Sequence, residues 1–420
     1  MEHPNDGRPE GGDDDEASHT RAAGPRRSTR LHTGAPRLDD RAGHPDGKDP
    51  VLSDTPGADA PTTLEELGYS DRWRALFAAQ AGDGHVPARV VRSDRGSLVA
   101  ATGDGLVRAT LAAGLRRAAS GPDELPVAGD WIALDPAPTH ETALVHAVLP
   151  RTSAFVRGVS GVESTAQVIA ANVDLVFVVH AIDRGLNRRR LERELALAWE
   201  SGAVPVVVLS KSDLVEAPEA VLSQAQAIAP GVDVVITSAV SGESVEGLRA
   251  YAPHGRTVAL IGPSGVGKST LINALLGERR QATAEVRSSD GKGRHTTVAR
   301  ELVPLPGGGV LLDTPGLRAL DMIDAREGIA SAFDDIETLA ASCRFSDCGH
   351  GGEPGCAVAA AVAAGELPAA RLSSWHKLQR EAQVAAMKTD ARLRNEEARR
   401  WKIIHKSARQ HYKGEGRDRE

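Results

Sequence analysis

One eight-residue stretch constrains the fold of this chain more than any other feature. Residues 262–269 read Gly-Pro-Ser-Gly-Val-Gly-Lys-Ser and fit the pattern GxxxxGK[ST] in full. The stretch follows an apolar run at 257–261, which predicts a strand, and precedes a helical pattern at 270–276. Its glycines let backbone N–H groups point at phosphate oxygens, aided by the positive end of the following helix. The pattern therefore predicts a strand–loop–helix unit that binds a nucleotide.

Side-chain chemistry assigns roles within this phosphate loop. Lys268 is expected to reach the β- and γ-phosphates, and the Ser269 hydroxyl is expected to bind Mg²⁺. The predicted nucleotide contacts are Gly262, Pro263, Ser264, Gly265, Val266, Gly267, Lys268, Ser269 and Thr270.

A second motif, Asp-Thr-Pro-Gly at 313–316, follows an apolar run at 310–312. Asp313 is expected to hold Mg²⁺, and the Gly316 N–H to sense the γ-phosphate. The same four letters occur at 54–57, but no strand pattern precedes them there, so only the second copy is interpreted as functional.

Compact apolar runs alternate with helical patterns between residues 165 and 320. Because these runs show no apolar–polar alternation, they predict parallel strands buried on both faces by helices, an α/β domain. The predicted strands cover residues 173–179, 204–209, 232–237, 257–261 and 310–312.

Guanine recognition is predicted at Ser-Lys-Ser-Asp, residues 210–213, directly after one of these strands. Asp213 can accept hydrogen bonds from the guanine N1–H and exocyclic amine, and the stem of Lys211 can cover the base. Ser210 and Ser212 complete the motif; Ser210 stands where such motifs usually carry Asn, which predicts a looser brace on the phosphate loop. Ser238 and Ala239 follow the next strand and are expected to meet the base O6. Read alone, Ser-x-x-Asp can also cap a helix.

The order of these motifs is unusual for a GTPase. The base-reading motifs precede the phosphate loop, and a threonine loop at 293–297 and the motif at 313–316 follow it. A circular permutation, with the chain cut between two strands of the same sheet, explains this order.

A metal site is predicted near the other end of the chain. Cys343, Cys348, His350 and Cys356 lie within 14 residues, and three thiolates with one imidazole make a closed, structural Zn²⁺ site. The alternative is three reduced thiols beside a surface histidine.

Short β patterns between residues 86 and 157 predict a five-stranded barrel of the oligonucleotide-binding kind, preceded by a helix at 63–80. A purely structural β-domain is the alternative.

Residues 371–420 hold 14 Lys/Arg against 7 Asp/Glu, with Trp375 and Trp401 among them. This pattern suits contact with a phosphate backbone, or else a solvated helix.

The fold predicted is multidomain: an OB-like β-barrel, an α/β P-loop GTPase domain with permuted motif order, and a small α-helical zinc-binding domain. The predicted boundaries are a disordered tail at 1–62, the barrel with its helix at 63–156, the GTPase domain at 157–322, the zinc-binding domain at 323–406 and a basic tail at 407–420.

Composition excludes other classes. Three cysteines cannot form a disulfide framework, which favours a reducing, cytoplasmic location. The longest apolar stretches are short and carry Asp or His, so no membrane span is expected, and the first residues do not resemble a secretory signal.

Between residues 86 and 406 the chain resembles a known family, the circularly permuted bacterial ribosome small subunit-dependent GTPase A. The likeness rests on Val-Ala-Gly-Asp-Trp at 127–131, the phosphate loop, Gly-Arg-His-Thr-Thr at 293–297, residues 313–316 and the cysteine spacing. The resemblance implies GTP hydrolysis that the small ribosomal subunit stimulates late in its maturation. It also implies that the barrel and the zinc domain bind ribosomal RNA. A monomer that binds GTP and GDP, and no membrane, is expected.

The hydrolytic water needs a partner, because Leu317 follows Gly316 where many GTPases place Gln. We predict that His295 positions this water and that Thr296 or Thr297 completes the Mg²⁺ shell; a plain surface histidine is the alternative.

Two other functions also fit the motifs. One is a P-loop ATPase or kinase in which Asp213 only caps a helix, and the other is a zinc-dependent RNA-binding module with a regulatory nucleotide site.

Overall fold

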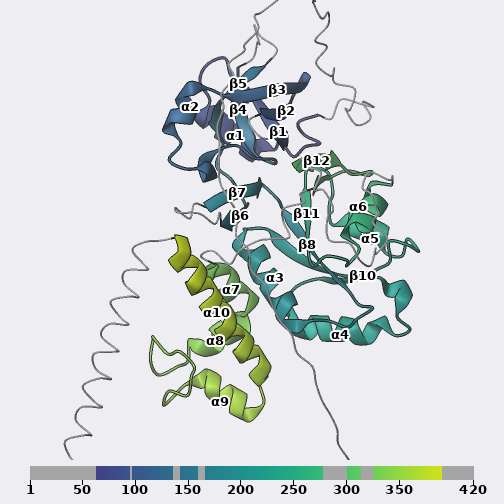
Figure 1. Cartoon of the computed structure of the whole chain (residues 1–420), viewed down its shortest axis with the longest axis vertical. Coiled ribbons are helices and arrows are strands. Elements are labelled where there is room, and N and C mark those ends of the chain that lie inside the picture. The colour runs from purple at the N-terminus through teal and green to yellow at the C-terminus, as the bar shows by residue number, and fades with distance from the viewer. Residues whose placement is uncertain are drawn as a thin grey trace, which may run out of the picture. The chain divides into compact units, whose positions relative to one another are not determined.

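The computed structural model describes residues 63–94, 97–135, 142–158, 166–277, 300–313 and 325–389, all within one structural unit (Figure 1). The predicted tails at 1–62 and 407–420 and the threonine loop at 293–297 lie outside these residues.

A parallel sheet carries the nucleotide motifs, as predicted. Its strands run in the order β10-β9-β8-β11-β13, with every neighbouring pair parallel, and β12 adds an antiparallel strand beside β13. The strands are β8 Leu175–Ala181, β9 Val204–Ser210, β10 Val234–Thr237, β11 Thr257–Ile261, β12 Arg300–Pro304 and β13 Val310–Asp313.

Helices cover both faces of this sheet, which explains the unbroken apolar runs. Along β8, Val176 and Val178 belong to the core beneath α3 (Arg188–Glu200) and α4 (Pro218–Ile228). Phe177 and Val179 belong to the core beneath α5 (Val245–Ala250) and α6 (Lys268–Leu276). The carboxyl ends of the strands therefore stay free for ligands at one edge of the sheet.

The predicted five-stranded barrel is present. Its strands pair in the order β1-β2-β3-β5-β4, and β4 pairs back to β1 and closes the ring. Short elements α2 (Ala113–Ala118) and η1 (Pro122–Glu124) connect β3 to β4. The strands are β1 Val86–Asp94, β2 Ser97–Thr102, β3 Gly105–Leu111, β4 Trp131–Leu134 and β5 Ala143–Val148.

The leading helix is shorter than predicted, because α1 covers only Asp71–Gln80. Residues 64–68 form turns, at whose start Thr63 and Glu66 bond to each other's backbone N–H. Gly68 then takes a φ of +94°, a left-handed conformation that ends the turn and separates it from α1.

Barrel and parallel sheet form one continuous 11-stranded sheet, which the sequence analysis did not predict. The connection is β1 to β12, through the pairs Arg92 with Glu301 and Ser93 with Arg300. A separate hairpin, β6 (Ala154–Gly158) and β7 (Ala166–Ala171), was also not predicted, and β6 spans the boundary expected at residues 156 and 157.

Arg89 of β1 reinforces this connection from within the core, where its side chain is 2% exposed. Its guanidinium donates to Thr257 Oγ1 of β11 (2.8 Å), to the carbonyls of Asn172 (3.2 Å) and Gly129 (3.3 Å), and to that of Leu67. Burial lowers the pKa of Arg89 to about 10, so the group stays charged at neutral pH.

Four helices make up the described C-terminal region, in agreement with the predicted helical character. Arg371 of α10 is 2% exposed and fastens this region to the GTPase helices. It bonds to Asp335 through two nitrogens (2.5 and 2.7 Å), to Glu192 of α3 (3.3 Å) and to the Ile228 carbonyl of α4 (3.1 Å). The helices are α7 Arg326–Ala332, α8 Asp334–Ala340, α9 Ala357–Ala364 and α10 Ala369–Thr389.

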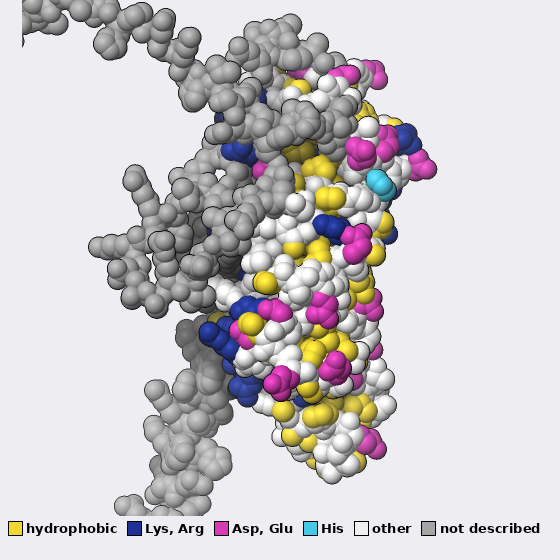
Figure 2. Space-filling view, turned by 90° about the vertical axis from the view of Figure 1, so that its right-hand side faces the viewer, with side chains coloured by type: hydrophobic (Ala, Val, Ile, Leu, Met, Phe, Trp, Pro, Cys, Tyr) yellow, Lys and Arg dark blue, Asp and Glu magenta, His cyan; other side chains and the backbone are white. Residues whose placement is uncertain are grey.

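Within the described residues, no helix combines the length and apolar character needed to cross a membrane. On the face shown in Figure 2, Lys and Arg side chains gather at the lower left edge, whereas acidic side chains are spread over the rest. Positive charge is therefore unevenly distributed on this face.

Candidate nucleotide and metal sites

The phosphate loop leaves β11 and enters α6, as predicted. Gly262 has a φ of +138°, and a Cβ there would lie 2.3 Å from the carbonyl oxygen of Val179, so only glycine fits. Gly267 has a φ of +91° and directly precedes the first turn of α6. This geometry directs backbone N–H groups of the loop and helix start toward one position, where an anion is stabilised.

Lys268 is only 9% exposed and lies against the loop. Its ammonium donates to the carbonyls of Gly262 (2.7 Å) and Pro263 (2.5 Å). Ser269 and Thr270 occupy the same first turn and are half-buried. A cation and a hydroxyl are thus placed beside the loop, as the phosphate-binding prediction requires.

Ser210, at the end of β9, contacts the phosphate loop directly. Its side chain is 5% exposed, and its hydroxyl lies 2.7 Å from the Val266 carbonyl and 3.3 Å from the His180 carbonyl. The strand end is close enough to the loop for a short side chain to reach it. Serine was expected to hold the phosphate loop less firmly than asparagine would. It nevertheless forms a hydrogen bond to the loop.

Asp213 and Ser238 come together from the ends of β9 and β10. The Ser238 hydroxyl donates to the Asp213 carboxylate (2.6 Å), and Asp213 remains exposed at the sheet edge. Asp213 caps no helix, because η2 (Ser212–Leu214) has Lys211 and α4 has Ala217 at the N-cap, neither with a side-chain capping bond.

The remaining base-motif residues are held by acidic partners that the sequence analysis missed. Lys211 adopts a φ of +65° and pairs with Asp183 (3.1 Å). The Ser212 hydroxyl donates to Glu243 (2.6 Å), whose backbone carbonyl also accepts from Thr237. Ala239 follows Ser238 directly and is half-buried. No local pattern marks Asp183 or Glu243, because each acts on a residue 28 or more positions away.

Part of the predicted magnesium site is described. Asp313 ends β13, which lies beside β11, and Ser269 lies in the first turn of α6, which follows β11 through the phosphate loop. Hard oxygen donors of this kind suit Mg²⁺. Four further predicted residues, His295, Thr296, Thr297 and Gly316, lie outside the described part of the chain.

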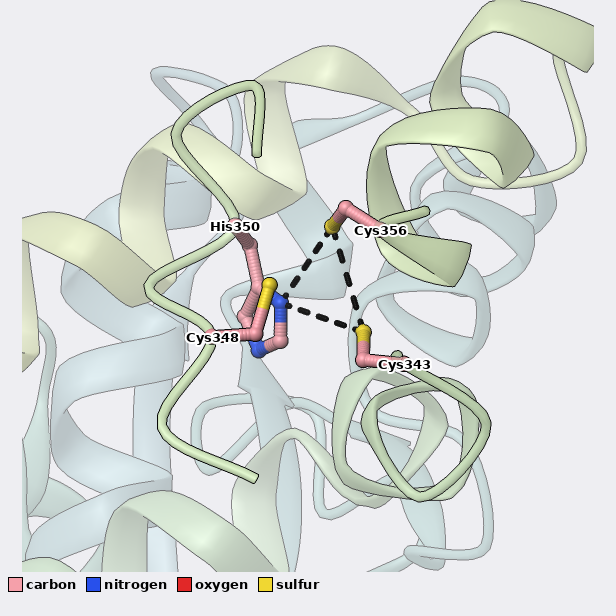
Figure 3. A group of neighbouring side chains, drawn as sticks. All are labelled: Cys343, Cys348, His350 and Cys356. Carbon is pink, nitrogen blue, oxygen red and sulfur yellow. Dashed lines mark hydrogen bonds between the residues drawn. The ribbon is translucent and has the colours of Figure 1, made fainter. Parts of the chain in front are cut away.

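The four predicted metal ligands form one cluster, drawn in Figure 3. Their ligand atoms all lie within 4.8 Å of one another. Cys343 Sγ and Cys356 Sγ are 3.9 Å apart, and His350 Nδ1 lies 3.7 Å from Cys343 Sγ and 3.5 Å from Cys356 Sγ. A tetrahedral Zn²⁺ with bonds of about 2.3 Å to sulfur and about 2.1 Å to nitrogen separates its ligands by roughly 3.6–3.8 Å. The donor set and its spacing fit a structural zinc ion.

The backbone around this cluster is shaped by hydrogen bonds. Glu353 accepts from the N–H groups of Gly349 (3.0 Å) and Gly351 (2.7 Å), and between them His350 takes a φ of +57°. Burial lowers the pKa of His350 below its ordinary value, which keeps the imidazole neutral and its lone pair available. Cys356 stands at the N-cap of α9, where its sulfur accepts the Ala359 N–H (3.3 Å).

The chain is similar in sequence to known proteins. The chain is 46% identical to the small ribosomal subunit biogenesis GTPase RsgA of Streptomyces coelicolor, over 81% of this chain and 92% of that protein. It is 47% identical to the protein of the same name from Streptomyces avermitilis, over 84% of this chain and 95% of the relative.

Two solved structures share the fold. YjeQ from Thermotoga maritima matches with a TM-score of 0.54 at 24% identity, over 71% of this chain and 98% of that one. YloQ, described as a circularly permuted GTPase, matches with a TM-score of 0.53 at 21% identity, over 72% and 97%. The family model for the RsgA GTPase matches residues 148–323. Because the identity with the Streptomyces proteins extends over most of both chains, this chain belongs to the RsgA GTPase family.

Proposed function

We propose that this chain is a GTPase that binds the small ribosomal subunit, is stimulated by it and acts late in its maturation. The observation that carries the proposal is the Asp213–Ser238 contact at the same sheet edge as a complete phosphate loop. The chain's membership of the RsgA GTPase family supports the biological role, because relatives carry the name small ribosomal subunit biogenesis GTPase.

In this proposal the two strand ends read the base. The exposed Asp213 carboxylate accepts the guanine N1–H and exocyclic amine, which adenine cannot supply in the same pattern. Lys211 covers the base with its stem, and Ala239 offers its backbone N–H to O6. Ser210 couples this edge to the phosphate loop through Val266.

The loop and its neighbours bind the phosphates. Residues 262–270 surround them, and Lys268 exchanges its carbonyl partners for phosphate oxygens. Ser269, Asp313 and either Thr296 or Thr297 would hold Mg²⁺, which would neutralise charge on the phosphates. Gly316 senses the γ-phosphate through its N–H.

His295 is proposed to position the attacking water, because leucine at position 317 cannot. Single-turnover hydrolysis by His295→Ala with small subunits present tests the assignment. We expect stimulated turnover to fall at least tenfold. A change within about threefold, less than about 1 kcal/mol of barrier, would contradict it.

The metal in the Cys₃His cluster is proposed to be one structural Zn²⁺, and the barrel and zinc domain are proposed to contact ribosomal RNA. We further infer a monomer that works in the cytoplasm, where cysteines stay reduced and ribosomes assemble.

The decisive experiment measures GTP hydrolysis with and without purified small subunits, and competition between GTP and ATP for binding. We expect guanosine selectivity and turnover that rises when subunits are added. Preference for ATP would instead indicate an ATPase or kinase, and absence of turnover with subunits would indicate an RNA-binding module with a regulatory nucleotide site.

A further inference from the structure

A pocket of about 790 Å³ lies beside the phosphate loop, where three parts of the chain meet. The start of α3 forms one wall, residues Gly262–Ser264 of the loop form the second, and the middle of α10 forms the third. The base-reading and metal-binding residues do not line it. The pocket therefore overlaps the sites described above only at Gly262–Ser264 of the phosphate loop.

The pocket lining carries four cationic side chains against two carboxylates, and both carboxylates already have partners. Glu381 of α10 pairs with Arg193 of α3 at 2.7 Å. Glu194 bonds to His180 Nε2, also at 2.7 Å, and His180 is only 4% exposed. The acidic groups are thus engaged with protein partners rather than with the remaining cations.

The other three cations, Arg189, Arg190 and Lys377, are exposed and approach the pocket from two different helices. Among the residues that the structure describes, none of the three has an ion-pair partner. The positive end of α3, capped by Asn187, adds to their field, because the Asn187 side chain accepts the Arg190 N–H (3.0 Å) and also lines the pocket.

Ser374 supplies an independent indication of a ligand. Its side chain lines the pocket, is 3% exposed, and has a hydroxyl with no hydrogen-bond partner within the described part of the chain. Buried hydroxyl groups in native proteins are nearly always bonded. A phosphate group in the pocket can accept hydrogen bonds from this hydroxyl and from the neighbouring guanidinium groups.

We propose that this pocket binds a backbone phosphate of RNA in the small ribosomal subunit. The inference rests on the proposed function, which supplies the RNA. A mostly polar wall with exposed cations at its rim suits a polyanionic strand that passes across the opening, rather than an enclosed small molecule, whose pocket would be mainly apolar. Because residues 262–264 form part of the wall, the bound RNA contacts the loop that holds the nucleotide.

The test is the salt dependence of binding to purified small subunits, with a non-hydrolysable GTP analogue present. We expect Arg190→Ala and Lys377→Ala each to weaken binding and to make the slope of log affinity against log salt shallower by about 0.7–0.9, one phosphate contact. Arg184→Ala is the matched control, because Arg184 is an exposed arginine in the turn before α3 that does not line the pocket. Its slope should stay closer to that of the unmodified protein.

A second variant tests the pocket without changing charge. Ser374→Ala should weaken subunit binding at least threefold while the thermal unfolding midpoint stays within about 1 °C, so that the weaker binding does not come from lost stability. If the unmodified protein binds subunits but Arg190→Ala and Lys377→Ala match the Arg184→Ala control, the pocket is not the RNA site. If the unmodified protein itself does not bind subunits, this result contradicts the proposed function, and the inference about the pocket is contradicted as well.

Discussion

Ser210 connects the predicted base-recognition motif to the phosphate loop through one buried hydroxyl. It ends the strand that leads into Asp213, and it contacts the carbonyl of Val266 inside the phosphate loop. An asparagine in this position would offer two donors on a longer side chain. The serine makes its contact because the strand end and the loop are adjacent, so the link between the two motifs persists through a single bond.

We expect Ser210→Ala to weaken GTP and GDP binding about five- to tenfold, since one hydrogen bond to the loop contributes roughly 1 kcal/mol. Ser210→Asn should bind at least as tightly as the unmodified chain. Ser223→Ala, an exposed serine on α4, is the control. Calorimetric titration measures all three, and equal affinities for Ser210→Ala and the control would show that the contact does not support nucleotide binding.

Asp213 allows a test of base identity. Asp213→Asn should lower GTP affinity about 100-fold or more, because two hydrogen bonds to a charged acceptor are lost, each contributing roughly 1.5–3 kcal/mol. The asparagine amide should instead donate to the 2-carbonyl of xanthine. Competition binding with GTP and xanthosine triphosphate measures both effects. The gain for xanthosine excludes misfolding as the cause, and unchanged GTP affinity would remove Asp213 from the base site.

At the scale of elements, the Cys₃His cluster brings a short loop together with the ends of two helices. Cys343 follows α8, Cys348 and His350 lie in the loop, and Cys356 starts α9, so a metal ion bound here would connect two helices. The cluster takes the place of a core that this short loop cannot form.

Replacement of one ligand tests this role. We expect Cys348→Ser to lower bound zinc from one ion per chain to well below half, and to make the region around α9 sensitive to proteases. Ser346→Ala, two residues away and exposed, is the matched control and should keep its zinc. Elemental analysis and limited proteolysis give the readout; full zinc content in Cys348→Ser would mean that this thiolate is not a ligand.

Arg371 fastens α10 to the GTPase helices. Arg371→Met should destabilise the chain by about 3 kcal/mol, because it leaves the half-buried Asp335 without its cation and the buried Glu192 with Arg188 alone. Arg380→Met on the exposed side of the same helix should cost less than about 0.5 kcal/mol. Urea unfolding compares the two, and a loss below about 1 kcal/mol for Arg371→Met would show that the bonds do not hold the helices together.

The sequence predicted elements whose cause is local. The unbroken apolar run of β8 revealed burial on two faces, and the glycines of the phosphate loop revealed its turn. Contacts between distant residues left no local mark. Arg371 and Glu192 are 179 positions apart, and the residues around either one do not indicate that the two side chains meet. The start of α1 was placed too early because the turn at 64–68 begins with helix-forming residues, and Gly68 and the N-cap residue Ser70 separate them from the helix.

At the scale of the whole described unit, the barrel and the nucleotide-binding sheet share one backbone hydrogen-bond network. The strand pairing between β1 and β12 is short, with two register pairs, so it needs support from side chains. Arg89 supplies that support, since it starts in the barrel and donates to Thr257 at the beginning of β11, the strand that leads into the phosphate loop. Its guanidinium also lies 5.3 Å from the ring centre of Trp131 in β4.

This arrangement predicts that barrel and GTPase sheet unfold together. Arg89→Leu removes the guanidinium donor from the Asn172 carbonyl and the Thr257 hydroxyl, which should cost about 3 kcal/mol and uncouple the two parts. Scanning calorimetry should show one transition for the unmodified protein and two for the variant, with the calorimetric enthalpy exceeding the van't Hoff value only in the latter. Arg108→Leu, an exposed arginine on β3, should keep the single transition. A single transition in Arg89→Leu at an unchanged midpoint would mean that the β1–β12 pairing alone couples the barrel to the phosphate loop.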